Sequence, residues 1–138
     1  MAKVQILIAM TIDGFLPSSM NPLLDWVKMS RDGFTSWHED CTFPLYPGYP
    51  LVDLICEKDT TSASCVYQAE ICDETNVELL RGLSLYHLID EMVIYLLPLV
   101  AGKGIHVAEH FISGCWKLYQ SKSYKNGVCR MIYRKVLQ

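Results

Sequence analysis

The chain begins with a run of apolar residues that constrains the fold more than any other segment. Residues 4–10 read VQILIAM, and after Gln5 both alternating faces of the run are apolar. A strand with one face in water alternates apolar and polar side chains, whereas a strand covered on both faces is apolar throughout. The run therefore predicts a central strand of an α/β sheet with structure packed on both sides.

Turn and capping residues divide the next part of the chain. Asn21 followed by Pro22 predicts the start of a short helix, because asparagine is a favourable N-cap and proline fits the first helical position. Residues 32–50 are rich in proline and glycine and predict a loop. The β-branched and aromatic content of 51–56 and 65–72 predicts two strands.

The second half of the chain has clearer signals. Apolar residues at helical spacing predict a helix over 75–90. The apolar run that follows, 91–101, predicts a buried strand that bulges or ends at Pro98, since proline cannot donate a ladder hydrogen bond. Asn126-Gly127 separates two strand-like segments and predicts an antiparallel hairpin at the end of the sequence.

Composition limits the class of protein. A length of 138 residues is enough for one domain, 1–138. The hydrophobic fraction of 51% is high for a small domain and predicts an apolar surface buried in a homodimer. No run is long enough to span a membrane, and the six cysteines form no C-x-x-C motif. We therefore expect a soluble cytoplasmic protein with free thiols, because no export signal is recognisable.

Charge is distributed unevenly along the sequence. The net charge of −3 predicts no general affinity for nucleic acid. All 15 acidic residues precede His110, whereas every charged residue after it is basic. These are Lys117, Lys122, Lys125, Arg130, Arg134 and Lys135. We interpret them as residues that protect strand edges and balance the negative charge of the acidic part of the chain. Phosphate binding is the less favoured alternative.

The segment DETNVELL, which starts at Asp73, opens the helix predicted in the middle of the chain. Helix N-termini attract phosphate because free N–H groups and the positive end of the dipole face it. Thr75 and Glu78 have the spacing of a capping box, in which each side chain accepts a hydrogen bond from the other residue's N–H. Val77 and the neighbouring carboxylates would also hinder a diphosphate. We interpret the segment as a structural cap, with a residual anion site as the alternative.

Three stretches have a more specific pattern: IAMTIDGFL (8–16), LLDWV (23–27) and LIDEMVIYLLPLVAGKGIHV (88–107). Together with Trp116 before the hairpin, they resemble the dihydrofolate reductase-like family, in particular its branch similar to the C-terminal domain of the riboflavin-pathway reductase. The resemblance implies an α/β three-layer sandwich, with a central mixed β-sheet flanked by helices and a C-terminal antiparallel hairpin. It also implies NADPH as hydride donor, a pterin-like or aminopyrimidine small-molecule substrate, and dimers.

Two departures from the family pattern concern the cofactor. The Gly-Lys/Arg-x-Thr phosphate segment of the family is not found between Ser30 and Val66. Thr75-Asn76-Val77 stands where the family has a Gly-Gly turn before the helix. We therefore expect a weakened cofactor site.

The resemblance also implies site residues. Asp25, on the first helix, would be the catalytic acid, because a carboxyl beside an apolar side chain can protonate a ring nitrogen during hydride transfer. A solvated helix residue is the alternative. The substrate would contact Met10, Asp13 and Trp26, although Asp13 before Gly14 also fits a turn. The cofactor would contact Ala9, Thr75, Asn76, Gly102 and Gly104.

Other chemistry is less well supported by the spacing. His106, His110 and Cys115 could approach a zinc ion, but no fourth ligand has suitable spacing, and we predict no metal site. His38 and Cys41 could form a nucleophile pair, but residues this close in sequence rarely face one another correctly.

Two functions therefore remain open. The first is an NADPH-dependent reductase of a pterin or aminopyrimidine-type substrate with a weakened cofactor site. The alternative is a non-catalytic dimeric binding or structural module that retains the reductase fold.

Overall fold

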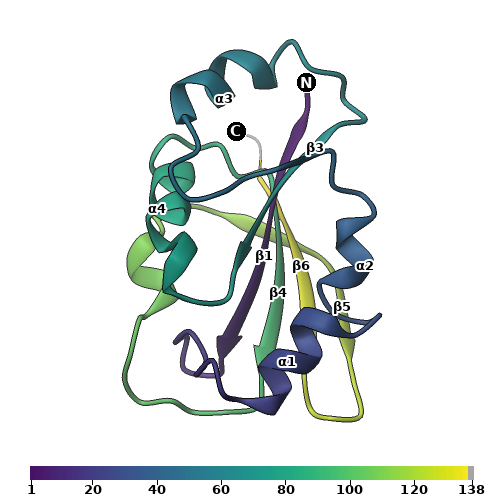
Figure 1. Cartoon of the computed structure of the whole chain (residues 1–138), viewed down its shortest axis with the longest axis vertical. Helices are drawn as coiled ribbons and strands as arrows, with labels where there is room; N and C mark the ends of the chain where they lie inside the picture. The colour runs from purple at the N-terminus through teal and green to yellow at the C-terminus, as the bar shows by residue number, and fades with distance from the viewer. Residues whose placement is uncertain (137–138) are drawn as a thin grey trace.

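The computed structural model describes residues 1–136 (Figure 1). The strands in this range form one mixed sheet in the order β2-β3-β1-β4-β6-β5. They are β1 (Lys3–Thr11), β2 (Phe43–Pro44), β3 (Val66–Ile71), β4 (Glu91–Leu97), β5 (Trp116–Ser123) and β6 (Cys129–Lys135). β2, β3, β1 and β4 are parallel, and β6 and β5 continue the sheet in antiparallel pairing.

Helices connect the parallel strands. They are α1 (Pro22–Met29), α2 (Thr35–His38), α3 (Leu51–Lys58) and α4 (Val77–Leu85), with the short 3-10 helices η1 (Glu74–Asn76) and η2 (Val107–His110). Within residues 1–136, no helix combines the length and the apolar character needed to cross a membrane.

β1 is the central strand that its apolar run predicts. It pairs with β3 on one side and β4 on the other. Its side chains alternate between two cores: Ile6 and Ile8 belong to one, and Leu7 and Ala9 to the other. Because both faces of the strand are covered, the run has no polar alternation.

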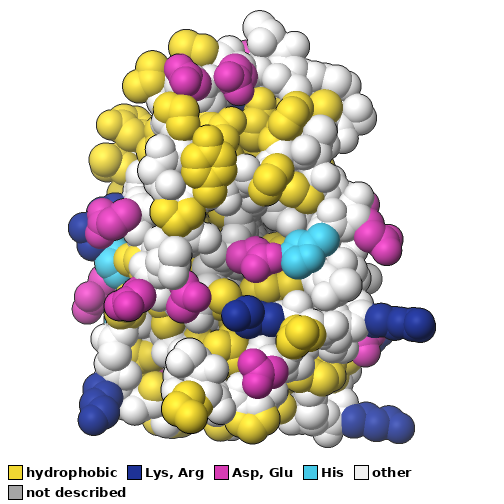
Figure 2. Space-filling model, in the orientation of Figure 1, with side chains coloured by type: hydrophobic (Ala, Val, Ile, Leu, Met, Phe, Trp, Pro, Cys, Tyr) yellow, Lys and Arg dark blue, Asp and Glu magenta, His cyan; other side chains and the backbone are white. Residues whose placement is uncertain are grey.

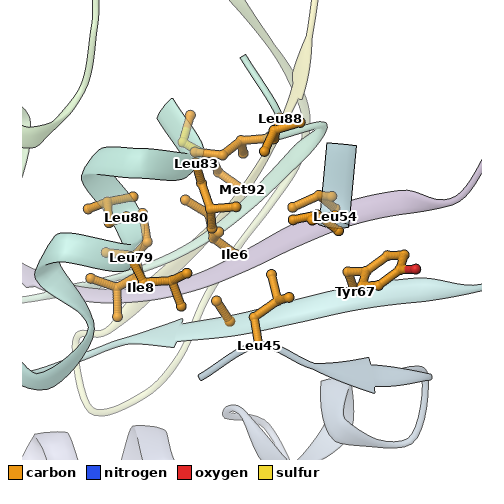
Figure 3. Close-up of a cluster of buried hydrophobic side chains, with 14 of the residues drawn as sticks. Ile6, Ile8, Leu45, Leu54, Tyr67, Leu79, Leu80, Leu83, Leu88 and Met92 are labelled. Carbon is orange, nitrogen blue, oxygen red and sulfur yellow. The ribbon is translucent and has the colours of Figure 1, made fainter. Parts of the chain in front are cut away.

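The helices form a layer on each face of the sheet, so the three-layer prediction is confirmed. α3 and α4 supply Leu54, Leu80 and Leu83 to the core on one face, where they meet Ile6 and Ile8 (Figure 3). α1 lies on the opposite face with its Leu24 and Val27 buried against the sheet. Figure 1 shows α1 and α2 following one another on that side.

α3 corrects the prediction of a strand at 51–56. The helix follows Pro50 and buries Leu54 completely, while Val52 is 72% exposed. Its last residue, Lys58, is buried, and the ammonium lies 2.6 Å from the carboxylate of Asp90. This tertiary anchor, together with one buried helical position per turn, outweighs the strand propensity of a short apolar run.

The helix predicted over 75–90 is shorter in the structure. It ends at Leu85, because His87 adopts a left-handed conformation with φ of 55°. The Leu88 N–H then donates to the carbonyl of Leu83, which satisfies a carbonyl at the helix end. The chain continues directly into β4, which ends at Leu97 before Pro98, one of the two outcomes predicted for that proline.

A buried carboxylate joins the parallel and antiparallel halves of the sheet. Glu91 in β4 accepts a hydrogen bond of 2.6 Å from Gln5 in β1 and one of 3.1 Å from Arg134 in β6. Lys3 approaches the same carboxylate at 3.2 Å. Burial raises the pKa of Glu91, but the Gln5 hydrogen bond and the Lys3 charge outweigh it, so that the pKa is lowered.

The predicted hairpin is present, with Tyr124 N–H donating to Val128 across its turn.

Candidate functional site

Asp13 is used to hold a neighbouring loop. Its carboxylate accepts the amide N–H of Ala101 at 3.0 Å and that of Gly102 at 2.7 Å. Thr11 donates its hydroxyl to the same carboxylate at 2.5 Å. The Thr11 hydrogen bond and the two amides lower the pKa of Asp13 to about 2. Asp13 therefore anchors the loop after β4, a role that neither the predicted substrate contact nor the predicted turn with Gly14 anticipated.

The Gly102 amide is consequently not free to bind a phosphate. Gly102 and Gly104 both have positive φ, 74° and 121°, and their loop is exposed. Positive φ is the conformation for which glycine is suited. The two glycines shape the loop, and Asp13 already uses the N–H that a phosphate would need.

The predicted catalytic and substrate residues are not brought together. Asp25 is exposed on α1, whose buried side packs on the Leu7 and Ala9 face of β1. Trp26 packs edge-on against Tyr124, with ring centroids 5.1 Å apart. Met10 lies with the core on the other face of the sheet. A ligand in contact with Met10 would therefore have the sheet between it and Asp25.

Met10 borders an apolar groove, which we call the Met10 groove. The groove has a volume of about 480 Å³. It is floored by Ile8, Met92 and Ile94 of the sheet and walled by the segment after η2. Ala9, the neighbour of Met10, is fully buried on the opposite face and contacts the α1 layer instead. The groove falls in the size range of small-molecule sites.

The start of α4 does not contain the predicted capping box. Asp73 instead caps η1, because its carboxylate accepts the Thr75 N–H at 2.9 Å, while Asn76, the N-cap residue of α4, makes no side-chain cap hydrogen bond. The Val77 N–H donates to the carbonyl of Glu74, which forms the turn of η1. The aspartate preceding the expected cap competes successfully because its side chain reaches the amide two residues on. The amides of Thr75 and Val77 are thus occupied by groups of the chain itself, but the predicted pair of Thr75 and Glu78 does not form the cap.

Asn76 lies at a second depression, which we call the Asn76 pocket. Its volume is about 430 Å³. The pocket is lined by His38, Cys41, Pro44, Leu45, Gln68, Glu70 and Asn76. Figure 2 shows a histidine against an acidic side chain beside a hollow in the middle of this face, in keeping with the His38–Glu70 contact. Sequence reasoning missed Glu70 and Gln68, which lay in a predicted strand with no functional motif.

The amide group of Asn76 is only partly satisfied. Its Nδ2 donates to the carbonyl of Glu70 at 2.8 Å. Its Oδ1 is buried and has no hydrogen-bond partner among the described residues. Cys41, on the opposite wall, has its pKa raised by burial and then by the charge of Glu70, so its thiol stays protonated at neutral pH. The sequence-proposed pair of His38 and Cys41 thus lines one pocket but offers no activated thiolate.

The histidines of the possible zinc site have other partners. His106 stacks edge-on against Phe15 at 4.9 Å, and His110 contacts Arg81. Among residues 1–136, no three His, Cys, Asp or Glu side chains converge in a way that could hold a metal ion.

Parallel strands β3-β1-β4 extended by the antiparallel pair β6-β5, with helices on both faces, define the α/β fold of the dihydrofolate reductase-like reductases. The sequence resemblance is thereby confirmed as a resemblance of fold. No protein-family model matches the sequence, and no curated protein matches it either.

Solved structures match nearly the whole chain. A protein assigned to riboflavin biosynthesis in Shewanella sp. PV-4 is 18% identical with a TM-score of 0.55, over 98% of this chain and 99% of that one. A pyrimidine reductase-like protein from Corynebacterium diphtheriae is 9% identical with a TM-score of 0.55, over 99% and 93%. A diaminohydroxyphosphoribosylaminopyrimidine deaminase/5-amino-6-(5-phosphoribosylamino)uracil reductase from Thermotoga maritima is 11% identical with a TM-score of 0.54. The match covers 98% of this chain and 57% of the Thermotoga protein.

Two of the amides expected to meet the diphosphate of a nicotinamide dinucleotide are already occupied. Such a group needs free N–H donors at a helix start and positive charge beside it. Here the amides of Thr75 and Gly102 donate to Asp73 and Asp13. Glu74 adds a carboxylate to the first turn, and no lysine or arginine is among the described residues that line the Asn76 pocket.

Proposed function

We propose that this protein is a non-catalytic small-molecule-binding module that retains the reductase fold and has a weakened NADPH site. One observation carries the proposal: two of the amides expected to meet a diphosphate, those of Thr75 and Gly102, are occupied by carboxylates of the chain itself. Each of these carboxylates also carries a negative charge that repels phosphate. Reopening the site would require losing a native hydrogen bond and accepting like-charge repulsion.

The position of Asp25 supports the same proposal. A catalytic acid must reach the substrate within hydrogen-bond distance. Asp25 is exposed and lines neither the Met10 groove nor the Asn76 pocket. Hydride transfer would then have neither a well-held donor nor the predicted acid.

The ligand we propose is a flat heterocycle of the pterin or aminopyrimidine type, bound in the Met10 groove. The groove is largely apolar, with polar contacts available at its rim from Ser113. Flat heterocycles suit such a slot because their faces are apolar and their edges carry hydrogen-bonding groups. The Corynebacterium and Thermotoga proteins, whose names refer to pyrimidine chemistry, support the choice of ligand class.

A second candidate is an NADPH-dependent reductase of the same substrate class with weak cofactor binding. The fold likeness favours it, because the Corynebacterium reductase-like protein and the Thermotoga deaminase/reductase match 99% and 98% of this chain. In that case a cofactor would have to displace Asp73 and Asp13 from their amide partners on binding.

We also propose that the protein forms a homodimer in the cytoplasm. Ile112 and Leu118 are 38% and 48% exposed near Trp116, which borders the Met10 groove. Leu118 pairs with Tyr133, a residue that packs on the same face of the sheet. Exposed apolar side chains gathered on one face are typical of a subunit interface.

A thermal-shift experiment separates the two candidate functions. We expect no change in Tm at about 1 mM NADPH. If the Kd for NADPH were about a hundredfold below this concentration, the protein would be stabilised by about 2.7 kcal/mol, which raises Tm by several degrees. A pterin or aminopyrimidine panel tested in parallel should contain ligands that raise Tm. A dihydrofolate reductase assayed with NADPH under the same conditions is the positive control.

The outcomes are distinct. A rise in Tm with NADPH, together with substrate-dependent loss of NADPH absorbance, would support the reductase and contradict the binding module. A heterocycle that raises Tm without NADPH consumption supports the proposal. If neither NADPH nor any heterocycle raises Tm, the proposal of a pterin or pyrimidine-binding module is wrong.

A further inference from the structure

The Asn76 pocket exists because β2 is shorter than the strand beside it. β2 pairs with β3 only at Tyr67 and Gln68. Beyond that point the edge of β3 is left open at Glu70. η1 then turns back toward this edge, and the Asn76 side chain donates to the Glu70 carbonyl. The pocket is thus built from an unpaired strand edge closed on one side by an asparagine.

Two hydrogen-bond acceptors of this pocket are not fully paired, and they lie beside the thiol of Cys41 and the ring of His38. Asn76 Oδ1 has no donor among the described residues, because the amide orientation is set by the bond from Nδ2 to Glu70. A buried acceptor without a donor is unfavourable and is normally satisfied by a ligand or a bound water. Glu70 presents its carboxylate at the same place, with its side chain 35% exposed. His38 contacts Oε1 of that carboxylate, so Oε2 remains for another donor.

Carboxylates gather beside the pocket, and His38 is the basic side chain in its lining. Asp73 and Glu74 follow Glu70 within the next turn, and both are exposed. Burial is the larger cause of the raised pKa of Cys41, and the negative charge of Glu70 adds to it. Anions are therefore disfavoured, and a positively charged group gains from every carboxylate nearby.

The remaining wall of the pocket is apolar. Pro44 and Leu45 lie across from the polar atoms, and Leu45 is only 6% exposed. The pocket of about 430 Å³ therefore combines an apolar wall with an acidic, acceptor-rich end. A bare metal ion does not match this arrangement, since no three potential ligands converge within residues 1–136.

We propose that the Asn76 pocket binds a small organic cation, such as an amidinium or ammonium compound. Its N–H groups donate to Asn76 Oδ1 and Glu70 Oε2, and its apolar body covers Pro44 and Leu45. The site lies on a different part of the molecule from the Met10 groove, where the heterocycle is proposed to bind.

Benzamidine is a suitable probe, because it joins a planar cationic head to an aromatic ring. Benzoate has the same shape with the opposite charge and serves as the control. We expect saturable backbone NMR shifts at Glu70 and Asn76 with benzamidine and none with benzoate. A surface that binds any aromatic ring would respond to both compounds, and this result would contradict the proposal.

Substitution of the carboxylate tests the mode of binding. Glu70→Gln should weaken benzamidine binding about tenfold, because a hydrogen bond to a charged group contributes about that factor. Glu109→Gln removes an exposed carboxylate on η2 and should leave the affinity unchanged. Both variants should keep the Tm of the native chain, which shows that they are folded. Equal affinities of the native chain and Glu70→Gln, or no saturable binding of benzamidine at all, would overturn the inference.

Discussion

Several residues chosen as ligand contacts prove to be bound by the chain itself. Asp13 holds two amides of the loop after β4, and Asp73 holds the amide of Thr75. Both are aspartates with a short side chain that reaches nearby backbone donors. The sequence indicates that such residues are placed near turns, but it does not show whether their oxygens face a ligand or the chain.

Replacing Asp13 tests its role as an anchor. Asp13→Ala should accelerate amide hydrogen exchange at Ala101 and Gly102, because both amides lose their acceptor. Asp25→Ala removes an exposed carboxylate with no described partner and should leave exchange in that loop unchanged. Unaltered protection of Ala101 and Gly102 in the Asp13 variant would show that another group holds the loop.

The same anchor has a defined pH range. Because the folded pKa of Asp13 is lowered to about 2 from 3.8, its contribution is complete above pH 3.8 and is lost as the pH falls through about 2. Hydrogen exchange at Gly102 should therefore remain protected in mild acid, after correction for the intrinsic exchange rate. Loss of protection already near pH 5 would contradict this assignment.

Among the elements, α3 shows most clearly where sequence reasoning fails. Residues 51–56 are apolar and β-branched enough for a strand, yet they form a helix that rests on Leu54 and Lys58. A run this short has too few positions to distinguish the helical period of about 3.6 residues from the two-residue period of a strand. By contrast β1, the hairpin and the strand at 65–72 were predicted correctly, since their patterns are long or include a specific turn.

The anchoring of α3 can be tested with two substitutions in the same helix. Leu54→Ala should reduce the free energy of unfolding by about 2–5 kcal/mol, because a fully buried leucine leaves a cavity. Val52→Ala, at a position 72% exposed, should change it by less than about 0.5 kcal/mol. Chemical denaturation measures both. Similar losses in the two variants would indicate a strand or a frayed segment in place of the helix.

For the molecule as a whole, the sheet was predictable and the sites were not. The order of helices and strands, together with the three family-like stretches, was sufficient for the three-layer architecture. The Asn76 pocket, however, joins His38, Glu70 and Asn76 through strand pairing and one hydrogen bond. Their spacing in the sequence follows no motif, so only the folded chain reveals that they meet.

Glu91 should control the stability of the whole sheet in acid. Its folded pKa is below the usual 4.5, so its contribution is present above that value and is lost as the pH falls through the lowered pKa. Glu91→Gln should cost about 1–3 kcal/mol at neutral pH, because Lys3 and Arg134 are partly exposed and can be rehydrated. It should also reduce the dependence of stability on pH below 4.5. Urea denaturation across this range measures the effect. If Glu91 made no such contribution, the stability of the native chain and that of Glu91→Gln would depend on pH in the same way.

The proposed dimer is tested by mass in solution. Light scattering of the native chain should give twice the mass of 15.7 kDa, and Leu118→Lys should give the monomer, because a charge would be buried in the interface. Val52→Lys, on α3 away from Leu118, should remain a dimer. A native chain that elutes as a monomer at all concentrations would contradict the proposal.

The position of β1 has a consequence for how the chain emerges from the ribosome. β1 is synthesised first, but its hydrogen-bonded neighbours come much later: Gln68 is 63 residues beyond Gln5, and Glu91 is 86 residues beyond it. A newly made β1 therefore waits with both edges unpaired until β3 and β4 have been translated, although α1 can cover one of its apolar faces sooner. During that interval it is the segment most in need of a chaperone, and slowing translation after β1 should lower the yield of soluble protein.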